Sequence, residues 1–225
     1  MRRALALALL ACAVSCAPRP PSPAWVAAEM RPEFEDGNPY VVAQRIRIDA
    51  PRDSVWRMLS RSASARRWSV IVHHIDVLSG RDGVVGTVRR CYLCPKGTFD
   101  ERVVALEPPS YRKLACIATA DLEGAMRNIP GNFAYQNFDS LDANTTELQL
   151  TITYELIYGP LNGLVDACYA RPRLGQVLAK NLVNMKALVE NGERYQRVHA
   201  FEGGEARCPE WPSPTASGSE GIPSR

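Results

Sequence analysis

Two adjacent histidines, His73 and His74, precede a CxxC motif that begins at Cys91. Imidazole and thiolate are the ligands of structural zinc, which usually takes four of them at a tetrahedral site. A zinc site is therefore one interpretation, but the chain has a single CxxC motif and the two histidines are neighbours. We predict instead that no metal is bound. Three cysteines are predicted to be small buried hydrophobic side chains, namely Cys91, Cys116 and Cys168.

The CxxC spacing also raises the question of a disulfide between Cys91 and Cys94. On a straight strand, residues three apart point to opposite faces and their Cα atoms lie about 10 Å apart. A disulfide needs Cα atoms within about 7 Å, so the bond requires Cys94 to belong to the turn at Pro95. Cys208, near the C-terminus, is free or paired, and the sequence does not assign the disulfides.

Charged and titratable side chains interrupt several stretches that alternate polar and apolar residues as strands do. Side chains at i and i+2 share a face of a strand. This rule groups His73 with Ile75 and Val77, Arg89 with Cys91, and Glu101 with Val103. Such residues are candidates for the polar lining of a binding site, and the alternative is that Arg89 and Glu101 form a structural ion pair.

The elements that position these residues begin with a strand over residues 41–49, followed at once by a helix. Pro51 suits the first helical position, and Val55, Trp56 and Leu59 have helical spacing. A second short helix is predicted over residues 62–68. Residues 72–156 then alternate as six strands, with turns at 80–83, 95–97, 108–109 and 142–144, so the sheet should be antiparallel.

The last element is a long helix that ends at Asn191-Gly192, a typical stop signal. Apolar residues recur in it at intervals of three and four. Pro172 is predicted to start this helix after a separate turn over residues 160–169, and one long kinked helix is the alternative.

Composition limits the classes of function. The chain has 225 residues, 46% hydrophobic content and a formal net charge of +3, which suit one domain with a core of ordinary size and predict no nucleic-acid partner. We divide it into a signal peptide (1–15), a proline-rich linker (16–39), a folded domain (40–195) and a disordered tail (196–225).

The order of strand, two short helices, six strands and long helix resembles the helix-grip superfamily, also known as SRPBCC, which includes START lipid-transfer domains and polyketide cyclases. The likeness rests on "IDAPRDSVWRMLS", "GVVGTVRRCYL", "FDERVVALEP" and "VLAKNLVNMKALVE". It implies an α+β fold in which a curved seven-stranded antiparallel sheet wraps round the long C-terminal helix and encloses a ligand cavity.

Plant hormone receptors of this superfamily have a "G-T-x-R" strand followed by "E-R" on the next, with the glutamate facing the pocket. The matching "GTVR" and "DERV" place Glu101 there, and the pocket lysine of those receptors matches His73. Histidine would replace a permanent cation with a titratable group. The loop "LCPKG" lacks the receptors' gating motif, so gating of that kind is not predicted.

The resemblance implies an apolar pocket with a few polar groups that orient one end of a ligand. The residues proposed for it are His73, Arg89 and Glu101 as polar groups, Tyr135, Phe138 and Tyr154 as an aromatic wall, and Leu178, Leu182 and Met185 on the helix. Alternatively, the aromatic residues are core. We predict a binding protein for a hydrophobic small molecule or lipid, without cofactor or catalytic residues. A polyketide cyclase or aromatase acting on a hydrophobic substrate is the competing function.

The first twenty residues combine a basic start with an apolar run over residues 4–14. The run is shorter than the roughly 20 apolar residues that span a bilayer, so a signal peptide is predicted. The segment resembles a bacterial lipoprotein signal with its lipobox at residues 13–16, which implies that Cys16 carries a membrane anchor. A lipobox at residues 9–12 and an ordinary secretion signal are the alternatives. The expected product is an exported monomer in the bacterial envelope.

Overall fold

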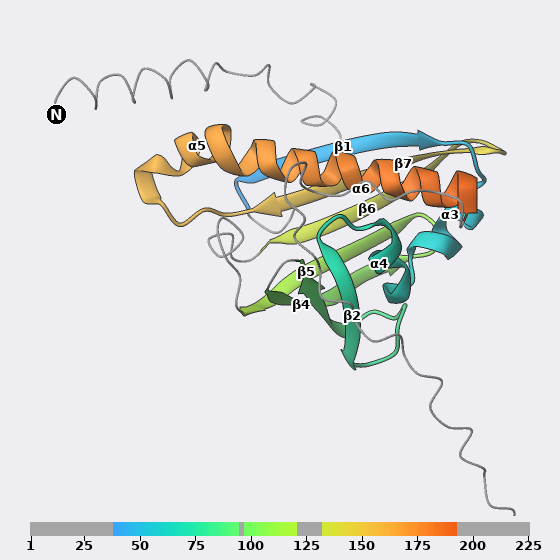
Figure 1. Cartoon of the computed structure of the whole chain (residues 1–225), viewed down its shortest axis with the longest axis horizontal. Helices are drawn as coiled ribbons and strands as arrows, with labels where there is room; N and C mark the ends of the chain where they lie inside the picture. The colour runs from blue at the N-terminus through green and yellow to red at the C-terminus, as the bar shows by residue number, and fades with distance from the viewer. Residues whose placement is uncertain (1–37, 95–96, 121–131, 193–225) are drawn as a thin grey trace, which may run out of the picture.

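The computed structural model describes residues 38–94, 97–120 and 132–192 of the chain. Cys16, the predicted signal peptide and the C-terminal tail with Cys208 lie outside the described residues. The described part is an α+β arrangement of one sheet and the helices that cover one of its faces (Figure 1).

Seven antiparallel strands form one sheet in the order β1-β7-β6-β5-β4-β3-β2. The first strand pairs with the last, and every other pair consists of strands that follow one another in the chain. The predicted seven-stranded helix-grip sheet is therefore confirmed. The strands are β1 (Tyr40–Ile48), β2 (Val72–Ser79), β3 (Val88–Leu93), β4 (Thr98–Glu107), β5 (Tyr111–Ala120), β6 (Phe133–Asp142) and β7 (Thr145–Tyr154).

Two short helices follow β1, as predicted. They are α3 (Arg52–Leu59) and α4 (Ala65–Trp68), with the 3-10 turn η1 (Ser62–Ser64) between them. Pro51 lies at the N-cap of α3 rather than at its first helical position, and its carbonyl accepts a hydrogen bond from the Ser54 N–H at 2.9 Å. Because proline has no N–H, Pro51 itself adds no donor that would need a partner where the strand becomes a helix.

Helical turns run without a break from Gly159 to Asn191. They are η3 (Gly159–Leu161), α5 (Asn162–Val165), the π-helical turn η4 (Asp166–Ala170) and α6 (Arg171–Asn191). The alternative of one kinked helix thus describes this region better than a separate turn. The π turn ends two residues before Pro172, which cannot donate to the carbonyl four residues before it, that of Cys168 within the turn. Helix α6 ends at Asn191, and its C-cap residue Gly192 has a φ of +60°, which glycine adopts readily. None of the described helices is both long and apolar enough to cross a bilayer.

The main hydrophobic core lies between α6 and the strands β1 and β7, along which α6 runs (Figure 1). The C-terminal half of α6 also meets α3 and α4. Burial of this apolar surface therefore holds α6 against this side of the sheet. Its most buried members include Val42, Ile48, Val55, Leu59, Phe138, Leu148, Leu150, Tyr154, Leu178, Leu182, Met185 and Leu188.

Two buried asparagines of α6 hold the chain where it passes from α4 to β2. Asn184 Nδ2 donates to the Trp68 carbonyl at 3.0 Å, and Asn181 Oδ1 accepts from the Val70 N–H at 2.8 Å. Residues three apart on a helix share a face, so both amides reach the same segment. They fix the position of α6 relative to the start of β2.

Replacing Asn181 with leucine should therefore lower the free energy of unfolding by about 1–3 kcal/mol, because the buried Val70 N–H loses its acceptor. Urea denaturation followed by circular dichroism measures the change. Gln176→Leu is the matched control, since Gln176 is exposed on the same helix. Equal stability of the two variants would show that the Asn181 contact does not support the fold.

Candidate functional site

The strand register identifies the residues on the face of the sheet that points toward α6, which we call the inner face. Gly175 of α6 lies against Gln44 of β1. Gln44 pairs with Leu150 on β7, Leu150 with Gln136 on β6, and Gln136 with Arg112 on β5. Because paired residues of antiparallel strands share a face, Arg112 lies on the inner face.

The same pairing register identifies the inner-face residues of β4 and β3, toward the other edge of the sheet. Cys116 follows Arg112 by strand alternation and pairs with Glu101 on β4, and Glu101 pairs with Arg89 on β3. Two arginines and one glutamate therefore converge on one face. Together with two neutral residues they form the inner-face polar cluster, which consists of Ser62, Arg89, Glu101, Arg112 and Gln136.

Arg89 and Glu101 form a buried ion pair, with the Arg89 Nε and Nη2 atoms 2.6 and 2.5 Å from Glu101 Oε1. The Arg89 Nη1 atom donates to the Ser62 hydroxyl at 3.0 Å, and Ser62 donates to Asp82. Burial disfavours the charged form of Arg89, but the Glu101 carboxylate raises its pKa above the ordinary value. The alternative prediction of an ion pair is confirmed, and contact of the pair with a ligand stays a prediction.

Arg112 lies beside this pair without a carboxylate of its own. Its Nη2 atom donates to Gln136 Oε1 at 2.7 Å, and its Nη1 atom donates to the Ser60 carbonyl just after α3. The Nε atom is buried and has no hydrogen-bond partner. Burial, and after it the like charge of Arg89, lower the pKa of Arg112 to about 9. Arg112 is therefore charged at neutral pH while only neutral acceptors bind it.

Two thiols accompany the cluster. Cys91 is buried, and its Sγ donates to Glu101 Oε1 at 3.4 Å, while Cys116 is half-buried opposite Glu101. Burial, followed by the charge of Glu101, raises the pKa of Cys91 well above its usual value and that of Cys116 to about 11. Both side chains are thus protonated at neutral pH and poor nucleophiles.

His73 does not share a face with Ile75 in the way that strand alternation predicts. The register of β2 shifts between Val72 and His74, so His73 occupies a β-bulge. Its ring lies edge-on to Tyr92, with 6.4 Å between centroids. A bulge adds one residue and breaks the period of two, which is why the alternation misplaced His73.

Tyr135 lies on the outer face of the sheet, so its predicted place in one aromatic wall with Phe138 and Tyr154 is wrong. It pairs with Lys113 and Thr151, and the Lys113 ammonium is 5.0 Å from its ring centroid. Tyr135 and Phe138 are three residues apart on one strand and therefore point to opposite faces.

The other proposed apolar residues lie on the inner side. Phe138 packs edge-on against Trp56 with 5.1 Å between ring centroids, and Tyr154 stacks on Tyr40 at 5.7 Å. The Tyr154 hydroxyl donates to Asp166 at the π turn. These side chains are core members, as the alternative prediction had it, and their contact with a ligand stays a prediction. The same core contains Leu178, Leu182 and Met185.

The cysteines differ from the prediction in part. Cys91 is a buried free thiol, as predicted, whereas Cys94 is disulfide-bonded, so the CxxC motif is not itself a disulfide. Cys168 is disulfide-bonded and exposed, because the π turn buries Asp166 and Ala170 instead. Within residues 38–94, 97–120 and 132–192, no group of three or more histidine, cysteine or acidic side chains could hold a metal ion.

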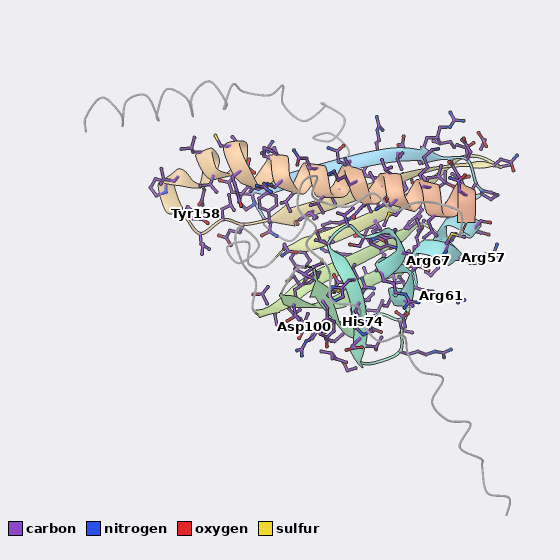
Figure 2. All side chains as sticks on the ribbon, viewed as in Figure 1. Arg57, Arg61, Arg67, His74, Asp100 and Tyr158 are labelled. Atoms are coloured by element: carbon purple, nitrogen blue, oxygen red, sulfur yellow. The ribbon has the colours of Figure 1, made fainter. Side chains whose placement is uncertain are left out.

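A second polar network lies on the outer face of β2, β3 and β4. His74 Nε2 is 2.7 Å from Asp76 Oδ1, and the Tyr92 hydroxyl donates to Asp76 Oδ2 at 2.9 Å. Arg90 binds Asp100 through its Nε and Nη2 atoms at 2.7 and 2.9 Å. Figure 2 shows His74 and Asp100 on the part of the sheet away from α6. This network is partly exposed and separate from the inner-face polar cluster.

The sequence prediction missed Arg112, Gln136 and Ser62. Arg112 alternates with Leu114 and Cys116 in the same way that Arg89 alternates with Cys91, so the same rule could have found it. Gln136 and Phe138 give the corresponding signal on β6. Ser62 lies in a turn, and no periodicity identifies a turn residue that meets a strand.

The family described as polyketide cyclase / dehydrase and lipid transport matches residues 40–190 of the chain. No curated protein matches it. Among solved structures, the protein XoxI from Bacillus cereus is 13% identical with a TM-score of 0.55, and the alignment covers 69% of this chain and 99% of that one.

Two enzymes are also similar in structure. The Zhui aromatase/cyclase from Streptomyces sp. R1128 is 20% identical with a TM-score of 0.50, over 67% of this chain and 90% of that one. A truncated norcoclaurine synthase from Thalictrum flavum is 12% identical with a TM-score of 0.50, over 70% and 95% of the two chains. At identities this low, the structural similarity establishes a shared fold and nothing further.

The buried ion pair predicts a difference between the two arginines. Arg89→Met should lower the free energy of unfolding by about 3–5 kcal/mol, because it leaves the Glu101 carboxylate buried and unpaired. Arg112→Met should cost at least about 2 kcal/mol less, since Arg112 forms no ion pair and its loss leaves no buried carboxylate without a partner. Guanidinium chloride denaturation measures both.

The double variant Arg89→Met/Glu101→Leu should recover part of the loss, because it removes both charges together. Arg90→Met is the control, since it removes a guanidinium from the outer face of the same strand, and its stability should change little. Equal losses of stability for Arg89→Met and Arg112→Met would contradict the claim that, of the two, only Arg89 neutralises a buried carboxylate.

The thiols predict a pattern of alkylation. In the native protein at pH 8, iodoacetamide should leave Cys91 unmodified and modify Cys116 slowly, because both thiols are protonated and Cys91 is inaccessible. The Cys116 rate should rise about tenfold per pH unit toward its pKa of about 11. Peptide mapping by mass spectrometry reports each site, and unfolding in denaturant should make both react. Rapid native modification of Cys91 would show that the strand around it opens.

Proposed function

We propose that this chain, which belongs to the polyketide cyclase/dehydrase and lipid transport family, binds a hydrophobic small molecule or lipid on the inner face of its sheet. The ligand's apolar part would lie against the inner-face side chains of β2 to β5. Its polar end would meet the inner-face polar cluster.

The observation that carries this proposal is the placement of the polar cluster. Ligand sites are mostly apolar with a few convergent polar groups. Three adjacent strands, β3, β4 and β5, each contribute one charged side chain to the cluster, and the turn after α3 covers it through Ser60 and Ser62. The surrounding inner-face residues are apolar or thiol side chains, namely Ile75, Cys91, Phe99, Val103, Leu114 and Cys116.

We further propose that the protein acts outside the cytoplasm as a lipid-anchored monomer, with Cys16 as the acylated residue. The disulfide-bonded state of Cys94 and Cys168 supports export, because disulfides persist in oxidising compartments. The partner would then be the membrane that holds the anchor, together with the hydrophobic ligand.

A cyclase or aromatase reaction is the competing function within the same family. Such a reaction needs a group that can move a proton at the ligand. Glu101 is the carboxylate of the cluster, and both Arg89 and Cys91 already bond its Oε1 atom. The Cys91 thiol is protonated and buried. A catalytic role would require Glu101 or Cys91 to leave these contacts and move a proton, whereas a binding role requires no such change.

Native mass spectrometry of the full chain carrying Cys16→Ser tests the proposed function, since this substitution prevents a covalent acyl group from being mistaken for a ligand. We expect a non-covalent adduct with a ratio of one to one, which organic solvent releases for identification. Phenylnaphthylamine, a neutral apolar fluorophore, should bind the emptied protein at the same ratio and be displaced by the recovered compound.

Ile75→Trp should weaken phenylnaphthylamine binding, because it fills the inner face at a half-buried position. His74→Trp is the matched control, since His74 lies beside it on the outer face. A folded protein that carries no adduct and binds phenylnaphthylamine at no saturable site would overturn the proposed function.

A further inference from the structure

We propose that the ligand's polar end is an anion, such as a carboxylate, and that Arg112 binds it. This inference rests on the proposed function, because it gives the chemical class of the ligand at that same site. The site would select an acidic amphiphile over a neutral one of the same shape.

The first observation is the charge balance of the inner-face polar cluster. It contains two guanidinium groups and one carboxylate, and Glu101 is taken by Arg89 through two of the Arg89 nitrogens. Asp82 is exposed and bonds Ser62, on the Arg89 side of the cluster. Among the residues that the structure describes, none places a carboxylate within ion-pair distance of Arg112. A buried charge without an opposite charge is costly, and one missing anion would restore neutrality.

The second observation is the way other arginines of this protein are bound. Arg89, Arg90 and Arg171 each direct the edge formed by Nε and Nη2 at a carboxylate, on Glu101, Asp100 and Asp166 respectively. Arg90 meets both Asp100 oxygens with this edge, whereas Arg89 and Arg171 each direct both nitrogens at one oxygen of their partner.

The Nε–Nη2 edge of Arg112 meets no carboxylate. Its Nη2 atom meets the neutral Gln136 amide at 2.7 Å, and its Nε atom is buried with no partner. Arg112 is only 3% exposed, so water from the surface does not readily satisfy that donor. A ligand carboxylate would bind at Nε and share the edge with Gln136, which can also donate through its amide nitrogen.

A pair of fluorophores that differ only in charge tests the inference. Anilinonaphthalene sulfonate has the skeleton of phenylnaphthylamine with an added sulfonate. We expect the emptied wild-type protein to bind one molecule of the sulfonate at least about tenfold more tightly than the neutral probe. Each probe should displace the other, which separates this site from weak adsorption on the surface.

Two variants test whether Arg112 is the source of the preference for the anionic probe. Arg112→Met removes the guanidinium, and Gln136→Glu supplies a carboxylate from the protein itself. Both should weaken sulfonate binding about tenfold or more while phenylnaphthylamine affinity stays within about twofold. Gln136→Glu should also raise the Tm of the ligand-free protein, a result that guards against loss of folding as the cause. Arg90→Met, on the outer face, should change neither affinity.

The outcomes separate the inference from the proposed function. If the wild type binds both probes equally, or if both variants keep wild-type affinity for the sulfonate, the inference is overturned and the proposed function stands. If neither probe binds the wild type at a saturable site, the proposed function fails and the inference fails with it.

Discussion

The turn from α3 to η1 crosses the inner face of β3, β4 and β5, and its polar groups have to be satisfied there. The long helix α6 packs mainly on β1 and β7, so this turn, together with α4 against β2, covers the other part of the inner face. The last carbonyls of a helix lack intrahelical partners and carry partial negative charge. Arg112 donates to the carbonyl of Ser60 after α3, and Arg89 donates to Ser62. The two arginines therefore tie the short helices to the sheet.

This arrangement divides the inner face into two parts with different physics. Between α6 and the β1–β7 pair, aliphatic and aromatic side chains interdigitate, and burial of apolar area supplies the stability. Under the α3–η1 turn, charged side chains meet backbone groups in a site of low dielectric constant, where each unpaired group is costly. The first part holds the fold together. In the second part, a bound molecule would stabilise the protein by pairing with a buried polar group that has no partner in the ligand-free state.

Periodicity in the sequence predicts most of the fold because each element buries one face. The strands and α6 follow from periods of two and about 3.6, and their order points to the helix-grip arrangement. The positions of single side chains are harder to predict. His73 was misplaced because a bulge adds a residue to β2, and Tyr135 was misplaced although its distance of three residues from Phe138 already put the two on opposite faces. Alternation groups residues on a face, but only pairing with Gln44 and Leu150 shows which face meets the helix.

The long-range contacts of the site lie beyond periodicity altogether. Ser62 meets Arg89 across 27 positions, and Ser60 meets Arg112 across 52. A turn residue has no repeating pattern that would reveal such a partner. The exposure of Cys168 was hidden for a similar reason, since a π turn changes which residues of a helix face solvent.

Gln136 is the residue at which stability and binding oppose one another. A glutamate there would have almost the same shape and would form an ion pair with Arg112, yet the chain has an amide, which leaves a buried guanidinium without a carboxylate in ion-pair contact. Proteins accept such local instability at sites where it serves binding. A ligand that neutralises Arg112 binds only the folded state, so its free energy of binding adds to the stability of the fold. Occupancy and stability would then rise together, and the protein without ligand would be the less stable form.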